Sequence, residues 1–253
     1  MSKETRERTV SYEILKVPSP SGQPHTILIT TMQTESTYMS GVRPHRLGTF
    51  EVSANYLSGP LARERMLNQA LVSKMGGDAD TLNNRVKITQ GVVEIHVVAL
   101  RGLGIGTFLF AKVVQWAIAF DPSLEVASIK VGSGDATEEN QVRRNFFYAN
   151  FGILFSDSES VESVVAGRSL PMHASELIPY EGWKTKVEVI TVNQRLVQME
   201  DEIGSLRSTN ADLTRNVRAK EQALVRRDNS KKQLLKFYGF IIMAMSLALA
   251  WKW

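Results

Sequence analysis

Hydrophobic and polar positions alternate in three segments near the N-terminus, and this alternation predicts β-strands at 9–17, 25–32 and 47–56. The next apolar segment, 61–75, has helical spacing and is followed by two glycines. Because glycine commonly ends helices, the pattern predicts a helix that stops there.

Longer apolar runs occupy the middle of the chain. Residues 92–100 are nearly all apolar and predict a buried strand, and residues 105–120 predict a strongly apolar helix that Asp121-Pro122 ends. The remaining expected elements are a strand at 126–131, a helix at 138–150, and strands at 161–166 and 186–192. This order predicts an α/β (α+β) domain over 1–186, a mixed sheet flanked by helices with some parallel pairing.

From 189 to 224 the apolar positions recur at alternating steps of three and four, which is typical of a coiled coil. Leu or β-branched residues stand at one heptad position and Leu or Met at the other, and Asn210 interrupts the first set. Two-stranded parallel coils use these residue types, and a buried Asn fixes their register. We therefore expect a long parallel dimeric coiled coil over 187–233, with a homodimer formed through 189–224. A single amphipathic helix packed on the domain is the alternative.

The C-terminal segment is strongly apolar and has no charge between Phe237 and Trp251. Residues 234–253 reach the roughly 20 residues that a membrane span needs, with Lys236 and Lys252 near the two ends. The pattern predicts a C-terminal transmembrane helix that acts as a tail anchor. An interfacial helix and a buried C-terminal helix are the alternatives.

The distribution of charge supports this division of the chain. The net charge is +4, with eleven Lys/Arg and seven Asp/Glu after residue 186, so residues 1–186 are neutral. A nucleic-acid partner is not expected, because the basic charge lies on the stalk and not on the domain. Lys and Arg just before the apolar segment predict a single-pass membrane protein whose N-terminal domain is cytoplasmic.

Some chemistry is excluded by composition. The chain has no cysteine, which rules out disulfides, thiolate metal ligands and a cysteine nucleophile. The histidines His25, His45 and His173 show no ligand-like spacing, so no metal site is expected.

A glycine-spaced turn, Arg101–Gly106, joins the expected strand to the expected helix. A P-loop would need a Lys after its last glycine, and a dinucleotide fingerprint would need its third glycine at Thr107. Glycines allow successive backbone N–H groups to close around a phosphate, and a helix N-terminus adds free donors and a favourable dipole. A tight turn without a ligand is the alternative.

Arg101, Gly104 and Gly106, placed after a strand and at the start of a helix, resemble the pyrophosphate-binding turn of the GCN5-related N-acetyltransferase (GNAT) superfamily. The stretch 138–155 is similar to the next helix of that family, since Tyr148 and Gly152 keep the family's spacing. The resemblance covers about a quarter of the chain, from 92 to 155.

Two residues of this second stretch depart from the family pattern. Asn140 lies one residue before the position of the family's asparagine, and Arg144 stands where a small alanine is usual. These departures affect the expected cofactor contact of this helix more than the expected fold.

The resemblance implies that acetyl-CoA, or another acyl-CoA, is the cosubstrate and that an amine attacks its thioester directly. The implied cofactor-binding residues are Val97, Val98, Arg101, Gly102, Leu103, Gly104, Ile105, Gly106, Thr107 and Asn140. A backbone N–H within 96–98 would polarise the thioester carbonyl. Tyr148 would be the general acid, or else a packing residue.

Glu94 and His96 are the candidates for the catalytic base. They are two residues apart on the expected strand and therefore share a face. The alternative is that they pair with each other or with a neighbouring strand.

These expectations combine into a membrane-anchored, coiled-coil-dimerised N-acetyltransferase that acts on an unidentified amine. The alternative is a catalytically degenerate GNAT-like domain that serves as a membrane-tethered binding or scaffold protein.

Overall fold

A computed structural model describes residues 5–40, 43–63, 70–90, 93–133, 138–156 and 161–250 of the chain. The chain divides into two compact units, residues 1–192 and 193–253. The first unit contains the sheet with helices α1 (Ile105–Phe120) and α2 (Glu138–Asn150), and the second contains nearly all of helix α3 (Val192–Ala250).

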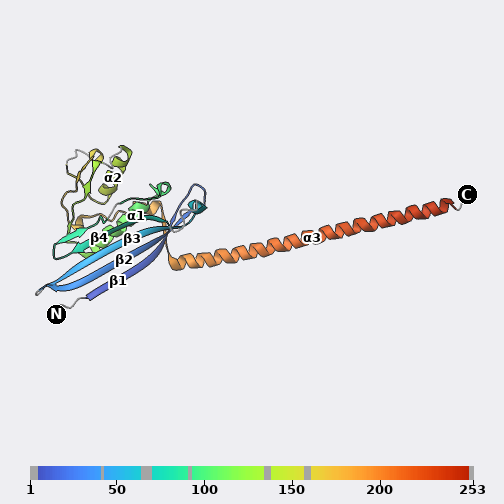
Figure 1. Ribbon diagram of the computed structural model, residues 1–253, viewed down its shortest axis with the longest axis horizontal. Coiled ribbons are helices and arrows are strands. Elements are labelled where there is room, and N and C mark those ends of the chain that lie inside the picture. The colour runs from blue at the N-terminus through green and yellow to red at the C-terminus, as the bar shows by residue number, and fades with distance from the viewer. Residues whose placement is uncertain are drawn as a thin grey trace. The chain divides into compact units, whose positions relative to one another are not determined.

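The first unit is built on a seven-stranded mixed sheet with the strand order β6-β5-β4-β3-β2-β1-β9 (Figure 1). Its strands are β1 (Thr5–Val17), β2 (His25–Ser40), β3 (Arg43–Ser58), β4 (Leu71–Asp80), β5 (Arg85–Lys87), β6 (Glu125–Val126) and β9 (Glu188–Thr191). All neighbours are antiparallel except β5 and β6, which are parallel. A second sheet pairs β7 (Lys130–Val131) with β8 (Gly167–Arg168). Short 3-10 helices are η1 (Pro60–Arg63), η2 (Val98–Leu100), η4 (Val161–Ser163), η5 (Ala174–Glu176) and η6 (Gly182–Thr185).

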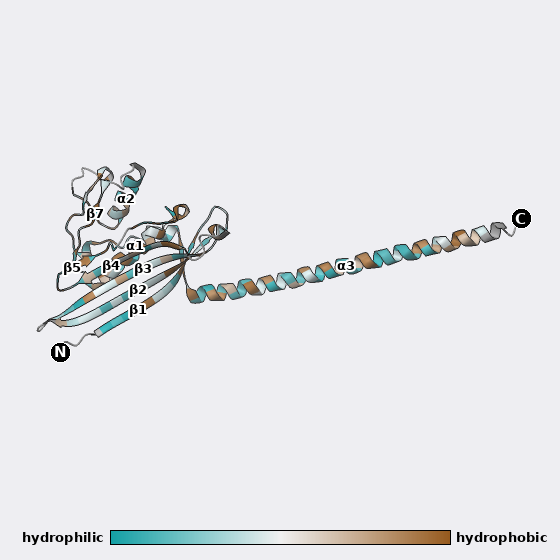
Figure 2. Ribbon diagram, in the orientation of Figure 1, coloured by the Kyte–Doolittle hydropathy of each residue, from teal (hydrophilic) through white to brown (hydrophobic). Residues whose placement is uncertain are grey.

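The core lies between α1 and one face of the sheet. Burial alternates along β3, where Phe50, Val52, Ala54 and Tyr56 are buried and the residues between them are partly exposed; Figure 2 shows polar and apolar residues mixed along β1, β2 and β3. Leu15 of β1, Ile27 of β2 and Val52 of β3 are fully buried. The helix α1 is nearly apolar all round, as expected for a helix that is covered on several sides.

Helix α1 approaches the sheet closely where Trp116 lies over β4. The Trp116 ring stacks on Phe50 with the ring centroids 5.4 Å apart. A Cβ on Gly77, which pairs with Phe50 across the sheet, would lie 2.7 Å from the Trp116 ring and 2.5 Å from the carbonyl oxygen of Lys87. Only glycine therefore fits at this point.

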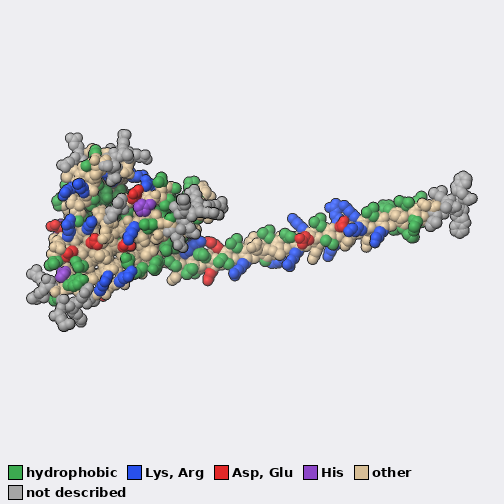
Figure 3. All heavy atoms as spheres, in the orientation of Figure 1, with side chains coloured by type: hydrophobic (Ala, Val, Ile, Leu, Met, Phe, Trp, Pro, Cys, Tyr) green, Lys and Arg blue, Asp and Glu red, His purple; other side chains and the backbone are tan. Residues whose placement is uncertain are grey.

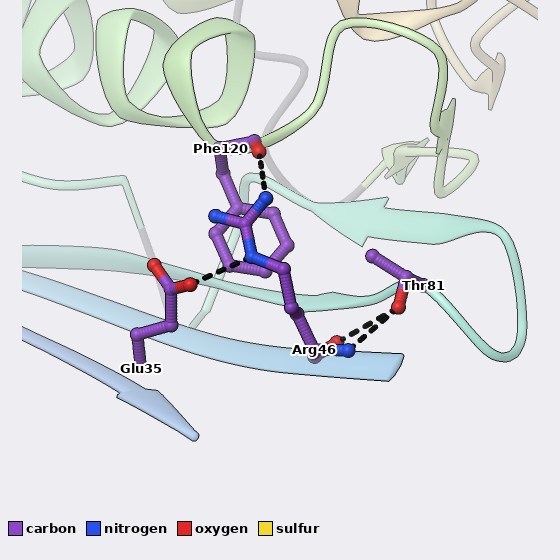
Figure 4. A network of polar contacts seen from close by, with 4 residues as sticks. All are labelled: Glu35, Arg46, Thr81 and Phe120. Atoms are coloured by element: carbon purple, nitrogen blue, oxygen red, sulfur yellow. Dashed lines mark hydrogen bonds and ion pairs between the residues drawn. The ribbon is translucent and has the colours of Figure 1, made fainter. Parts of the chain in front are cut away.

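The C-terminal end of α1, one turn after Trp116, is fixed to the sheet by Arg46 of β3 (Figure 4). Its Nε donates to Glu35 Oε1 at 2.6 Å, and its Nη1 donates to the carbonyl oxygen of Phe120 at 3.1 Å. The guanidinium also lies 4.4 Å from the centre of the Phe120 ring. A cation at the last carbonyl of a helix complements the helix dipole, so Arg46 stabilises α1 where it ends.

The helices α1 and α2 have the bounds that the sequence predicts. The helix expected at 61–75 is wrong. Its first residues belong to the short helix η1, 64–69 lies outside the described residues, and residues from Leu71 belong to strand β4. The strand expected at 92–100 is also wrong. The structure describes this segment from residue 93, where the chain is extended and then runs into the short helix η2.

The predicted fold class is wrong in placing a coiled coil over 187–233 and a transmembrane helix over 234–253. Val192–Ala250 forms one continuous helix, α3. No helix in the described part of the chain is long and apolar enough to cross a membrane. Side chains of 247–250 and all of 251–253 lie outside that part.

The predicted location, a cytoplasmic domain held at a membrane by a tail anchor, loses its basis with the span. Apolar side chains at the heptad positions of α3 are exposed, among them Leu196 at 54% and Leu206 at 66%. Lys and Arg side chains follow the same helix (Figure 3). Self-association through 189–224 stays a prediction, which light scattering of the full chain would test.

We predict that Gly77→Ala lowers the free energy of unfolding by about 1–3 kcal/mol, because the added methyl group overpacks the contact with Trp116. Chemical denaturation measures the change. Gly204→Ala on α3 is the control, since its added Cβ meets nothing within 4 Å. An unchanged midpoint for Gly77→Ala would contradict the close approach of α1 to β4.

We also predict that stability falls when the pH drops below about 6.5, the ordinary pKa of histidine. His25 is buried and its Nδ1 shares a hydrogen bond of 3.0 Å with the Tyr56 hydroxyl, which accepts from the Leu61 N–H. Burial lowers the pKa of His25, so folding favours the neutral ring and the unfolded chain takes up the proton first.

Denaturation at pH 7.5 and pH 5.5 measures this loss of stability. The loss should shrink in His25→Gln and persist in His173→Gln, because His173 is exposed. Equal losses in the two variants would show that another group carries the pH dependence.

Candidate functional site

The turn before α1 depends on two glycines with positive φ. Gly102 has φ +77° and Gly104, the N-cap of α1, has φ +88°, a region that side-chain-bearing residues rarely adopt. A Cβ on Gly104 would also lie 3.1 Å from Lys186 Cβ and 3.7 Å from Trp183 Cα. Gly104 therefore allows both the backbone reversal and the close approach of η6.

The turn offers a run of backbone donors. Within the described part of the chain, none of the N–H groups from Gly102 to Thr107 donates to a protein acceptor, and the first helical bond of α1 runs from Phe108 N to Gly104 O at 2.9 Å. The N-cap makes no side-chain hydrogen bond, and the first turn holds no acidic residue. The positive end of the helix dipole is thus left available to an anion.

The parallel strands β5 and β6 separate soon after they pair. β5 and β6 pair only at Arg85↔Glu125 and Val86↔Val126. The chain after β5 then follows β4, with bonds from Gln90 N to Gly76 O and from His96 N to Val72 O. The chain after β6 instead bonds to the segment 167–173.

This separation leaves backbone groups unused on the segment before the turn. Because His96 N–H points to β4, the N–H of Val97 points to the opposite side. Neither Val97 N–H nor Val98 N–H has a protein acceptor among the described residues. They are donors that a ligand carbonyl could use.

The base candidates lie on this segment. Glu94 and His96 are exposed, whereas Ile95 between them is partly buried against the core, so the two share a face as expected. Glu94 is joined to the turn, since its Oε1 accepts from Arg101 Nη2 at 2.7 Å. Arg101 Nε donates to the carbonyl oxygen of Ile95 at 2.9 Å. The structure thus brings Glu94 and Arg101 together and leaves neither charge unpaired.

Tyr148 of α2 lies within an aromatic cluster that includes Phe110 of α1. It is 8% exposed, and its ring contacts are Phe110, Phe147 and Phe155, at centroid distances of 5.3–6.0 Å. This geometry agrees with the packing role.

Two polar residues of α2 make local contacts. Asn140 Oδ1 accepts from Arg143 Nη2 at 2.7 Å. Arg144 donates to the carbonyl oxygens of Gly132, Val164 and Val165 at 2.8–3.2 Å. The arginine that departs from the GNAT pattern therefore links α2 to two neighbouring loops.

Two residues at the turn were missed by sequence reasoning. Lys186 Nζ donates to the carbonyl oxygen of Gly102 at 3.1 Å, and Trp183 packs edge-on against Phe108 with the centroids 4.9 Å apart. Both lie far from the turn in the sequence, so no local pattern could have indicated them.

Among the described residues, no group of three or more His, Asp or Glu side chains could hold a metal ion. Comparisons with protein-family models, with curated proteins and with solved structures found no match.

Proposed function

We propose that this protein is an N-acyltransferase that moves an acyl group, with acetyl the first expectation, from coenzyme A to an amine. The observation that carries the proposal is the turn Gly102–Thr107, whose backbone N–H groups have no protein acceptor in the described part of the chain. Such a turn at a helix N-terminus fits a pyrophosphate. Its resemblance to the GNAT turn narrows the ligand to coenzyme A.

The separation of β5 and β6 supports the same proposal. An acyl-pantetheine arm that starts at the turn would pass the segment 93–98, where the Val97 and Val98 N–H groups are unused. A thioester oxygen bound there would be stabilised as negative charge develops on it. The coenzyme would thus be held by backbone groups along its length.

The proposed reaction is a direct displacement. The amine nitrogen attacks the thioester carbonyl carbon, a C–N bond forms, and the C–S bond breaks. The amine proton passes to Glu94, directly or through water, and the coenzyme A thiolate takes a proton from a general acid or from solvent. Tyr148 could serve as that acid only if its hydroxyl reached the sulfur from the aromatic cluster.

A second candidate function is binding of coenzyme A, or a similar nucleotide, without catalysis. Two observations favour it. The Glu94 carboxylate is paired with Arg101, and Tyr148 is packed among aromatic rings. In that case the domain would be a recognition module that binds its ligand at the turn, while Glu94 and Tyr148 would only stabilise the fold.

We predict that Thr107→Glu weakens acetyl-CoA binding by at least tenfold, because it places a carboxylate among the donors of the turn. The same substitution should not destabilise the fold, since a carboxylate in the first turn of a helix is favourable. Calorimetric titration of the full chain measures binding, with Gln115→Glu, an exposed position on α1, as the control. No binding by the unmutated protein would remove both candidate functions.

A turnover assay with a panel of amines separates the two candidates. If Glu94 is the base, Glu94→Gln should lower kcat by about 10²–10⁴-fold without weakening acetyl-CoA binding, since the donors of the turn stay in place. Free thiol release from acetyl-CoA reports the reaction. Binding without any thiol release by the unmutated protein would favour the recognition module.

A further inference from the structure

We propose that Lys186 supplies the side-chain positive charge that holds the phosphates of the coenzyme at the α1 turn. The role falls to Lys186 because Arg101 is occupied by Glu94. This inference rests on the proposed function and adds a phosphate-binding residue that the sequence pattern does not contain.

Lys186 is held in place by the segment around η6. Its backbone N–H donates to the carbonyl oxygen of Trp183 at 2.9 Å, and Val187 after it is buried. Trp183 is anchored edge-on against Phe108 of α1. The stem of Lys186 passes over Gly104 with its Cβ 3.1 Å from the position of a Cβ there. Its ammonium therefore reaches the turn from a fixed base.

The charge of Lys186 is not neutralised by the protein. No Asp or Glu forms an ion pair with it within the described ranges. Within the described part of the chain its ammonium donates to the carbonyl oxygen of Gly102 alone, and an ammonium has three donors. Two donors are thus available to a ligand at the turn.

The position of this charge is unfavourable without an anion. A cation beside the N-terminus of a helix opposes the helix dipole, and α1 has no acidic residue in its first turn. An anion bound at the turn would remove this unfavourable term, because it would face both the ammonium and the free N–H groups.

Arg101 is less suited to the phosphates. Its Nη2 is bound to Glu94 and its Nε to the carbonyl oxygen of Ile95, so taking it to a phosphate would break two hydrogen bonds and release a carboxylate. Lys186 needs no such rearrangement. Arg101 is therefore assigned to Glu94, and Lys186 is assigned to the phosphates of the ligand.

The test is calorimetric titration of the full chain with coenzyme A and with S-acetylpantetheine, which lacks the pyrophosphate and the nucleotide. Lys186→Met keeps the stem over Gly104 and removes the ammonium, so it should weaken coenzyme A binding by about tenfold. Lys184→Met is the matched control and should bind like the unmutated protein, since Lys184 pairs with Glu181 at 2.5 Å. S-acetylpantetheine should bind all three proteins equally.

Further outcomes separate the inference from the proposed function. Lys186→Arg should bind coenzyme A within a few-fold of the unmutated protein, because it keeps the charge. Equal affinity of Lys186→Met and the unmutated protein for coenzyme A would overturn the role of Lys186 while the function stands. Loss of affinity in both Lys186 variants would assign the effect to packing over Gly104 and would also overturn it. Absence of binding by the unmutated protein would remove the function and the inference together.

Discussion

The close packing of α1 on the sheet is the interaction on which the candidate site depends. Trp116 fits over Gly77 and against Phe50, which sets the distance between the helix and β4. Arg46 holds the same C-terminal end of the helix, one turn further along, through the Phe120 carbonyl. The first turn of α1 lies at the opposite end of the helix, and its N–H groups have no protein acceptor among the described residues.

Two cations near this turn have different partners. Lys186 bonds to the carbonyl oxygen of Gly102, and Arg101 pairs with Glu94. Without a ligand, the Lys186 ammonium is opposed by the helix dipole, whose positive end lies at the same turn. An anionic ligand would convert this unfavourable interaction into binding free energy. The Glu94–Arg101 ion pair holds the proposed base next to the turn that we propose binds phosphate. Ligand binding and the availability of Glu94 as a base therefore depend on the same residues.

The sequence predicted those elements whose pattern is local. Helix α1 has apolar residues throughout and a stop at Asp121, and α2 ends before Gly152, so their bounds could be read directly. The helix expected at 61–75 is wrong because the two glycines after it do not end a helix. They lie in strand β4, where Gly77 makes room for Trp116, a contact between distant parts of the chain. Lys186 could not be found either, since it lies 84 residues from Gly102. The heptad pattern of α3 describes one helix and cannot by itself supply a partner.

In the proposed function, the backbone N–H groups of Gly102–Thr107 bind the phosphates of coenzyme A. Hydrogen exchange of the full chain, followed by mass spectrometry with and without saturating coenzyme A, tests this binding most directly. Exchange should slow in the peptides covering 102–107, because N–H groups that now lack an acceptor would gain one, and should stay unchanged in β1 and β2. Unchanged exchange at 102–107 while coenzyme A is bound would contradict it.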